Sequence, residues 1–185
     1  MAKETKQQDQ AFELFADAIK KNIDKTAEAF GVSPELYEEV RKALLEGVAL
    51  YEILGMKRST IDARYTLAYQ LYTGGKLEEA ETLFRWLCSY ANCDVPHWMG
   101  LAASRQAQGK YEEAIEAYQM AALYGALEDP APFYYSGVCF LKLNRREDAK
   151  VAMQTALTLG DAANADHKLI MAQAQALLTG LEEGA

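Results

Sequence analysis

The residues of this chain that could carry chemistry are few. They are three cysteines, two histidines and pairs of adjacent glutamates in a sequence of 185 residues. Cys88, Cys93 and His97 lie close enough along the chain to suggest a metal site. Their spacing matches neither a zinc finger nor a zinc ribbon, and no fourth ligand stands out. We therefore expect no metal, and we interpret Cys88 as a small apolar side chain buried in a helix.

The carboxylate pairs Glu78–Glu79 and Glu112–Glu113 have the residue types of a general acid and base. Both pairs are predicted to begin helices, where acidic side chains are favourable beside the positive end of the helix dipole. The sequence contains no P-loop, no GxSxG and no GxGxxG, and Gly74–Gly75 is predicted to be a turn rather than a phosphate cradle. We expect neither catalysis nor a cofactor.

The composition favours a globular cytoplasmic protein. Half of the residues are hydrophobic and a quarter are charged, which argues against disorder. The formal net charge of −8 and the lack of a basic stripe argue against nucleic-acid binding. The first residues are polar, no apolar stretch is long enough to insert into a bilayer, and the number of cysteines is odd. Together these features predict a cytoplasmic chain with reduced thiols.

A repeat of about 34 residues organises the middle of the chain, and this is the period of the tetratricopeptide repeat. Three segments align, beginning at Ile61, Val95 and Pro130. In such a repeat two helices cross closely, and only small side chains fit at the crossing. Small residues stand at the eighth and twentieth positions of the segments: Ala68, Ala102 and Gly137, and Ala80, Ala114 and Ala149.

The repeats predict an all-α fold, a solenoid of three tetratricopeptide repeats, because one helix pair cannot bury its apolar face alone. Leu67, Ala68 and Leu71 are expected to form the core side of the first helix. Residues that tolerate positive φ separate the helices of each pair: Gly74–Gly75, Gly109 and Asn144. The expected helices span residues 61–73, 77–91, 95–108, 111–124, 131–143 and 146–159.

Further helices are predicted on both sides of the repeats. An apolar face runs from Phe12 to Phe30 with helical spacing, and Gly31 ends it. Ser33 is the predicted N-cap of a second helix, with Pro34 in its first turn. A last helix over residues 164–179 would cap the solenoid. The predicted organisation is an N-terminal extension (1–60), three repeats (61–94, 95–129 and 130–160) and a C-terminal capping helix with a tail (161–185).

The concave side of such a solenoid is lined by the first helix of each pair. The predicted lining is aromatic and apolar, with few polar tips. Tyrosine offers a large contact area at low entropy cost and keeps a hydroxyl group for hydrogen bonding. Tetratricopeptide domains that bind acidic C-termini use Lys and Asn at the fifth and ninth positions of the first repeat. Tyr65 and Tyr69 stand there in this chain, so the groove lacks the cations that would bind a carboxylate. The predicted peptide-binding residues are Tyr65, Tyr69, Tyr72, Met99, Ala103, Gln106, Tyr134, Val138 and Leu141.

Two runs of sequence are more specific than the repeat pattern. They are YTLAYQLYTGGKLEEAETLFRWLC (65–88) and GLAASRQAQGKYEEAI (100–115), and LEGVALYEILGM precedes them. In these runs the chain resembles the class II chaperones of bacterial type III secretion systems, the translocator chaperones. The resemblance extends from about Leu44 to Leu178.

The resemblance implies a bacterial cytoplasmic protein without ATPase activity. Members of this family hold hydrophobic pore-forming translocator proteins before export and bind an extended N-terminal segment of the client in the concave groove. The nine residues named above match the positions of that groove. Many members form homodimers through their N-terminal helices, and some also partner a transcription activator.

Two other classes of function stay open from the sequence. A tetratricopeptide scaffold or regulatory module would bind a folded protein partner and have no export client. An enzyme would need a polar residue of the groove to act in catalysis.

Overall fold

The computed structural model describes residues 33–183 of the chain. The chain divides into two compact units, Met1–Val48 and Ala49–Ala185. The described part of the first unit, residues 33–48, contains helix α2 (Pro34–Leu45). The backbone N–H of Leu36 donates to Ser33 Oγ at 3.2 Å, which confirms Ser33 as the N-cap. The apolar face predicted from Phe12 to Phe30, and the Gly31 stop, lie outside the described residues.

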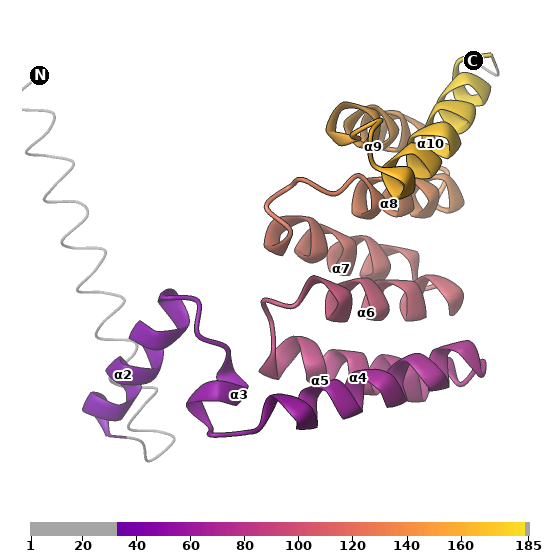
Figure 1. Cartoon of the computed structure of the whole chain (residues 1–185). Helices are drawn as coiled ribbons and strands as arrows, with labels where there is room; N and C mark the ends of the chain where they lie inside the picture. Colours follow the sequence, from indigo (N-terminus) through magenta and orange to yellow (C-terminus); the bar gives the residue numbers. More distant parts are fainter. Residues whose placement is uncertain (1–32, 184–185) are drawn as a thin grey trace, which may run out of the picture. The chain divides into compact units, whose positions relative to one another are not determined.

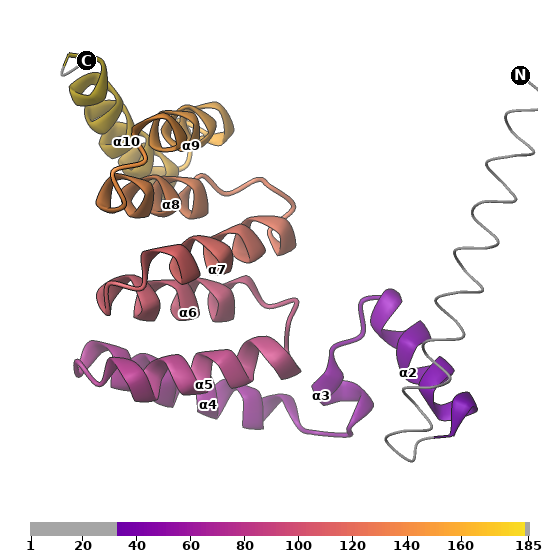
Figure 2. The same cartoon turned by 180° about the vertical axis from the view of Figure 1, so that it is seen from behind.

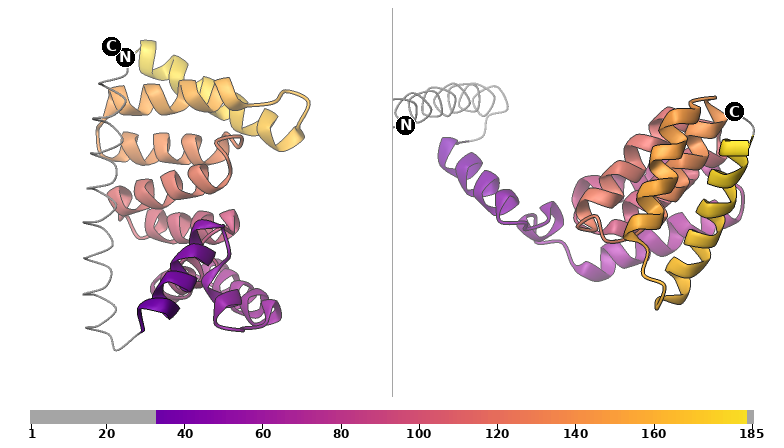
Figure 3. Two further views of the ribbon diagram at one scale, coloured as in Figure 1. Left: turned by 90° about the vertical axis from the view of Figure 1, so that its left-hand side faces the viewer. Right: turned by 90° about the horizontal axis from the view of Figure 1, so that it is seen from above.

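The second unit is a stack of helix pairs (Figures 1 and 2). A single turn, α3 (Leu50–Ile53), precedes it. The first pair is α4 (Arg58–Thr73) and α5 (Leu77–Tyr90), and the second is α6 (Val95–Ala107) and α7 (Tyr111–Tyr124). The third pair is α8 (Ala131–Lys142) and α9 (Arg146–Leu159). Helix α10 (Ala165–Glu183) packs against α9 and α8 at the end of the stack (Figure 3).

The predicted all-α fold is therefore confirmed, and residues 33–183 contain no strand. Each predicted helix of the repeats is present. The largest differences are at α4, which begins at Arg58 rather than at residue 61, and at α10, which ends at Glu183 rather than at residue 179. None of the helices in the described range is both long enough and apolar enough to cross a bilayer.

The turns inside the three pairs have the predicted backbone conformation. Gly75, Gly109 and Asn144 have φ values of 75°, 77° and 59°. Glycine has no Cβ to clash at positive φ, and asparagine is among the side chains that tolerate it best. Gly74, by contrast, has φ −79° and closes the last turn of α4.

The small residues predicted at the helix crossings are buried. Ala68, Ala80, Ala102, Ala114 and Ala149 have no exposed surface. Gly137 takes the position of Ala68 and Ala102 in the third repeat. A Cβ added to Gly137 would lie 2.6 Å from Met153 Cε, so a larger residue would not fit there. Larger side chains at these points would find no room between the two helices of each pair.

One core prediction for α4 is wrong. Ala68 is buried and Leu71 packs against the core, but Leu67 is 48% exposed. Helix α4 opens the stack, so its outer side has no earlier repeat to pack against. The period of the sequence could not show this, because it gives every repeat the same environment.

A buried carboxylate joins the first two repeats. Glu81 of α5 is only 7% exposed. It accepts hydrogen bonds from Arg105 Nε (3.2 Å), Gln108 Nε2 (2.9 Å) and Lys110 Nζ (2.8 Å), which belong to the end of α6 and the turn after it. Burial alone would raise the pKa of Glu81, but these donors outweigh it and lower the pKa to about 2. The ionised carboxylate thus stabilises the contact between α5 and the second repeat.

Gly100→Ala should destabilise the fold, because a Cβ at Gly100 would collide with the ring of Phe84, a side chain that is 1% exposed. We expect a loss of about 1–3 kcal/mol in the free energy of unfolding, measured by urea denaturation. The matched control is Gly180→Ala in α10, where a Cβ meets nothing within 4 Å. That change should be neutral or should stabilise by up to about 1 kcal/mol. Equal stabilities for both variants would contradict the close packing.

Glu81→Gln should change how stability depends on pH. The pKa of Glu81 is lowered in the folded chain from 4.5 to about 2, so its ionised form stabilises the fold above pH 4.5. This contribution is lost as the pH falls from 4.5 towards 2. The variant should be less stable than the unmodified chain at pH 7, and the difference should shrink as the pH falls through that range. Parallel curves of melting temperature against pH for the two chains would disprove this role of Glu81.

Candidate binding groove

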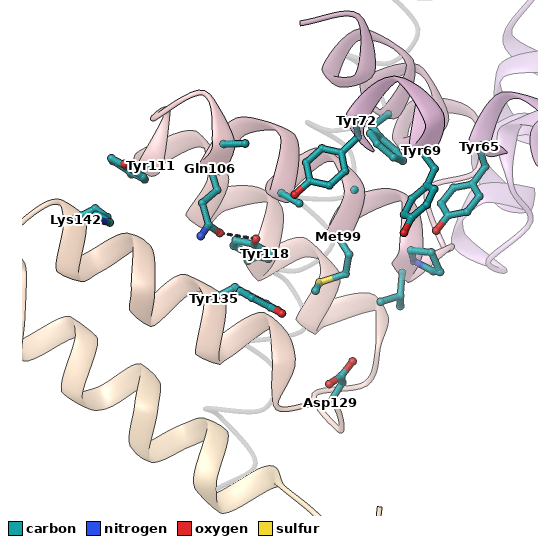
Figure 4. A pocket seen from close by; sticks show the side chains of 16 residues that line it. Tyr65, Tyr69, Tyr72, Met99, Gln106, Tyr111, Tyr118, Asp129, Tyr135 and Lys142 are labelled. Atoms are coloured by element: carbon teal, nitrogen blue, oxygen red, sulfur yellow. Dashed lines mark hydrogen bonds between the residues drawn. The ribbon is translucent and has the colours of Figure 1, made fainter. Parts of the chain in front are cut away.

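An aromatic cavity of about 690 Å³ lies along the first helices of the repeats (Figure 4). We call it the groove. Three tyrosines come from α4, a run of small and apolar residues comes from α6, and the rest come from α5, α7, α8 and the loop before α8. The lining consists of Tyr65, Tyr69, Tyr72, Phe84, Val95, Pro96, Met99, Gly100, Ala103, Gln106, Ala107, Tyr111, Tyr118, Asp129, Tyr135 and Lys142.

Six of the nine residues predicted for the groove line it together. They are Tyr65, Tyr69, Tyr72, Met99, Ala103 and Gln106. In Figure 4 the three tyrosines stand along one side, with Met99 and Gln106 across from them. The spacing of three and four residues places side chains on one face of a helix, so α4 and α6 present these residues to the same space.

The three residues predicted from the third repeat do not line this cavity. Tyr134 and Val138 pack instead against a small core cluster formed by Met153 and Ala156 of α9 and by Ala174 and Leu178 of α10. Leu141 is half-buried and is also absent from the lining. Helices α9 and α10 thus cover the side of α8 that carries Tyr134 and Val138.

The residues of α8 that line the groove are Tyr135 and Lys142, which the repeat pattern did not predict. Tyr135 stacks on Tyr118 of α7, with ring centroids 5.7 Å apart and planes 18° apart. Phe84 and Gly100 make the equivalent contact one repeat earlier. A sequence signal was present, since Tyr118 and Tyr135 occupy the positions of Phe84 and Gly100, but the period alone does not say that these two positions meet.

The tyrosines of α4 differ in how much of their surface is free. Tyr69 is 54% exposed. Tyr65 is half-buried and touches two rings, with centroids 6.0 Å from Phe84 and 5.5 Å from His97. Tyr72 is half-buried and packs against the core. Tyr69 therefore offers the largest unused aromatic surface of the three.

The floor of the groove carries one fixed hydrogen bond. The hydroxyl of Tyr118 donates to Gln106 Oε1 at 2.7 Å, as the dashed line in Figure 4 shows. Burial raises the pKa of Tyr118, so its hydroxyl stays protonated and remains a donor. The bond fixes the orientation of the Gln106 amide and leaves its NH2 group as a donor for a ligand.

A smaller cavity of about 220 Å³ adjoins the groove, and we call it the charged pocket. Tyr65 and Pro96 line both cavities. The other residues of the charged pocket are Arg58, Asp62, Asp94 and His97. His97 is 3% exposed, and its Nδ1 donates to the carbonyl oxygen of Ala91 at 3.1 Å. Burial lowers the pKa of His97, which keeps the imidazole neutral.

Reactive groups are not gathered in the groove. Burial raises the pKa of Cys88 to about 12 and that of Cys139 to about 11, so both thiols stay protonated. Glu78–Glu79 and Glu112–Glu113 are exposed in the first turns of α5 and α7, as predicted. Across residues 33–183, no three side chains of the His, Cys, Asp and Glu types come together as a metal site would require.

Comparison with known proteins agrees with this fold. The tetratricopeptide repeat family model matches residues 62–93 and 97–126. The chaperone protein SicA of Salmonella typhimurium is 33% identical over 114 residues, which cover 61% of this chain and 68% of SicA. These matches define the chain as a tetratricopeptide-repeat protein.

Two solved structures extend the match. A type III secretion complex from Aeromonas hydrophila has a TM-score of 0.74 and 27% identity, covering 80% of this chain and 97% of that chain. PcrH, a protein of Pseudomonas aeruginosa, in complex with the chaperone-binding region of PopD, has a TM-score of 0.66 and 29% identity, covering 70% and 96%. The chain belongs to the class II type III secretion chaperones, the translocator chaperones.

Proposed function

We propose that this chain is a bacterial cytoplasmic chaperone that binds an extended segment of a hydrophobic translocator protein in its groove. The observation that carries the proposal is the aromatic groove itself, with its exposed Tyr69. An exposed surface that is mostly aromatic and apolar often marks a site where a protein binds a partner. It suits a client segment with several spaced apolar side chains.

The contacts available in the groove support an extended peptide rather than a small polar ligand. Met99 adapts to irregular apolar shapes, and the tyrosines bury large areas at low entropy cost. The Gln106 amide, oriented by Tyr118, offers a hydrogen-bond donor for a main-chain carbonyl of the client. Apolar anchors would supply affinity, and main-chain hydrogen bonds would fix the register of the peptide.

We propose that Tyr65, Tyr69, Tyr72, Met99, Ala103 and Gln106 contact the client. Tyr135 and Lys142 take the places that the sequence predicted for residues of α8. Tyr134 and Val138 would then support the groove indirectly, by anchoring α8 to α9 and α10. Leu141 stays a prediction, as do a homodimer formed by the N-terminal helices and a complex with a transcription activator.

Such binding would protect a translocator before export. A pore-forming protein exposes apolar segments that aggregate or insert early if they are left free. A segment that is already extended in an open groove can be handed over without being unfolded. The chaperone would then need no nucleotide, in agreement with the absence of a P-loop from the sequence.

Tyr69→Ala should weaken client binding about tenfold, because a central aromatic anchor of an interface contributes more than 1 kcal/mol. The probe is a fluorescent peptide with the sequence of the chaperone-binding region of PopD, titrated by fluorescence anisotropy. Tyr69 is the better choice than Tyr65, whose contacts with Phe84 and His97 also hold the fold together.

The matched control is Leu123→Ala, which removes an apolar side chain that is 62% exposed but does not line the groove. It should leave the affinity unchanged. Equal binding by the Tyr69→Ala chain and the unmodified chain would refute the groove as the binding site. Failure of the unmodified chain to bind the probe would count against the proposed function.

A further inference from the structure

The charged pocket is a polar extension of the groove, and Tyr65 and Pro96 line both cavities. A peptide in the groove that passes these two residues therefore brings its next side chain to the charged pocket. The volume of about 220 Å³ is enough for a long side chain but not for a second segment of chain.

The pocket carries a net negative charge. Arg58 Nε lies 2.9 Å from Asp62 Oδ1, and Arg58 Nη1 lies 2.9 Å from Asp94 Oδ2. One guanidinium group thus faces two carboxylates, and the imidazole of His97 is neutral. The formal charge of the four side chains is about −1 at pH 7.

Asp94 Oδ2 is held by an ion pair rather than by an aligned hydrogen bond. Asp94 Oδ2 is buried, yet no described residue gives it a hydrogen bond. Arg58 Nη1 is close enough to attract it, but without the alignment of a hydrogen bond. His97 Nδ1 is 3.7 Å away and already donates to Ala91. Asp94 stands at the N-cap of α6, yet its side chain makes no capping bond. Asp94 is thus held by the ion pair with Arg58, while 27% of its side chain stays exposed to the charged pocket.

We propose that the charged pocket binds the cationic side chain of a lysine or arginine in the client segment, with Asp94 as its main partner. This inference rests on the proposed function and specifies the client further. The aliphatic stem of the cation would lie on Tyr65 and Pro96, and its charged head would face the exposed part of the Asp94 side chain and Asp62.

The charged pocket would help the chain to distinguish client segments that carry a basic residue from those that do not. An apolar residue at this point of the client would leave the net negative charge of the pocket without a balancing cation, and an acidic residue would place like charges together. Both arrangements bind less well than a basic residue. The apolar groove alone cannot distinguish one hydrophobic segment from another to this degree. The client is thus expected to carry a basic residue beside its apolar anchors.

Asp94→Asn tests this directly, with the PopD probe used above. The variant keeps the size of the side chain and removes its charge. We expect binding about tenfold weaker than that of the unmodified chain at low salt, with a shallower dependence on salt concentration. The matched control is Glu116→Gln, which makes the same change of net charge at an exposed position of α7 outside both cavities. It should bind as the unmodified chain does.

The decisive measurement is the coupling between Asp94 and the probe. Each lysine and arginine of the probe is replaced in turn by methionine. One replacement should weaken binding to the unmodified chain about tenfold and have no further effect on the Asp94→Asn chain. Unchanged affinity of the Asp94→Asn chain would overturn the inference. So would a loss that is the same for every probe.

A second variant separates charge from folding. Arg58→Gln makes the pocket more negative, so it should tighten binding of the cationic probe, opposite in sign to Asp94→Asn. Weaker binding by both variants would show that the cluster only supports the fold, and the inference would be wrong. Absence of probe binding to the unmodified chain would instead remove the proposed function on which the inference rests.

Discussion

Close approach of helices at residues without large side chains is the constraint on which this structure depends. Ala68, Ala80, Ala102 and Ala114 are fully buried where the helices of the first two pairs cross. Gly100 allows close packing between the first and second repeats, because the ring of Phe84 occupies the space where a Cβ would lie. Packing at these points sets the tilt of α4 and α6, and so the space left between their outward tyrosines and Met99.

Two equivalent repeat positions, those of Phe84 and Gly100 and of Tyr118 and Tyr135, form the floor of the groove with different side chains. Between the first and second repeats a large ring meets a glycine, and the ring of Phe84 occupies the space where a Cβ of Gly100 would lie. Between the second and third repeats two rings meet, Tyr118 on Tyr135, and their hydroxyl groups bring polarity to the floor. A repeat protein can in this way vary its binding surface without changing its backbone plan.

Two buried or half-buried carboxylates show how the environment decides the role of a charge. Glu81 accepts hydrogen bonds from three donors and is fully used in holding α5 to the second repeat. Asp94 lies beside the groove with one guanidinium group nearby and an oxygen without a donor. The first arrangement is structural, and the second leaves part of the Asp94 side chain exposed in the charged pocket beside the groove.

The sequence by itself determined the repeat, its period, its helices and its turns, because these depend on local spacing and on small residues at fixed intervals. It also determined the tyrosines of α4 and the residues of α6 that share one face.

Only the tertiary structure decided which residues of α8 reach the groove. Helix α10 draws Tyr134 and Val138 into a core cluster, and Tyr135 takes the open side. Likewise the exposure of Leu67, the burial of Glu81 and the meeting of Arg58 with Asp94 depend on contacts between segments far apart in the chain. A periodic pattern describes one repeat and its average neighbours, whereas the first repeat, the last repeat and the loops between them have neighbours of their own.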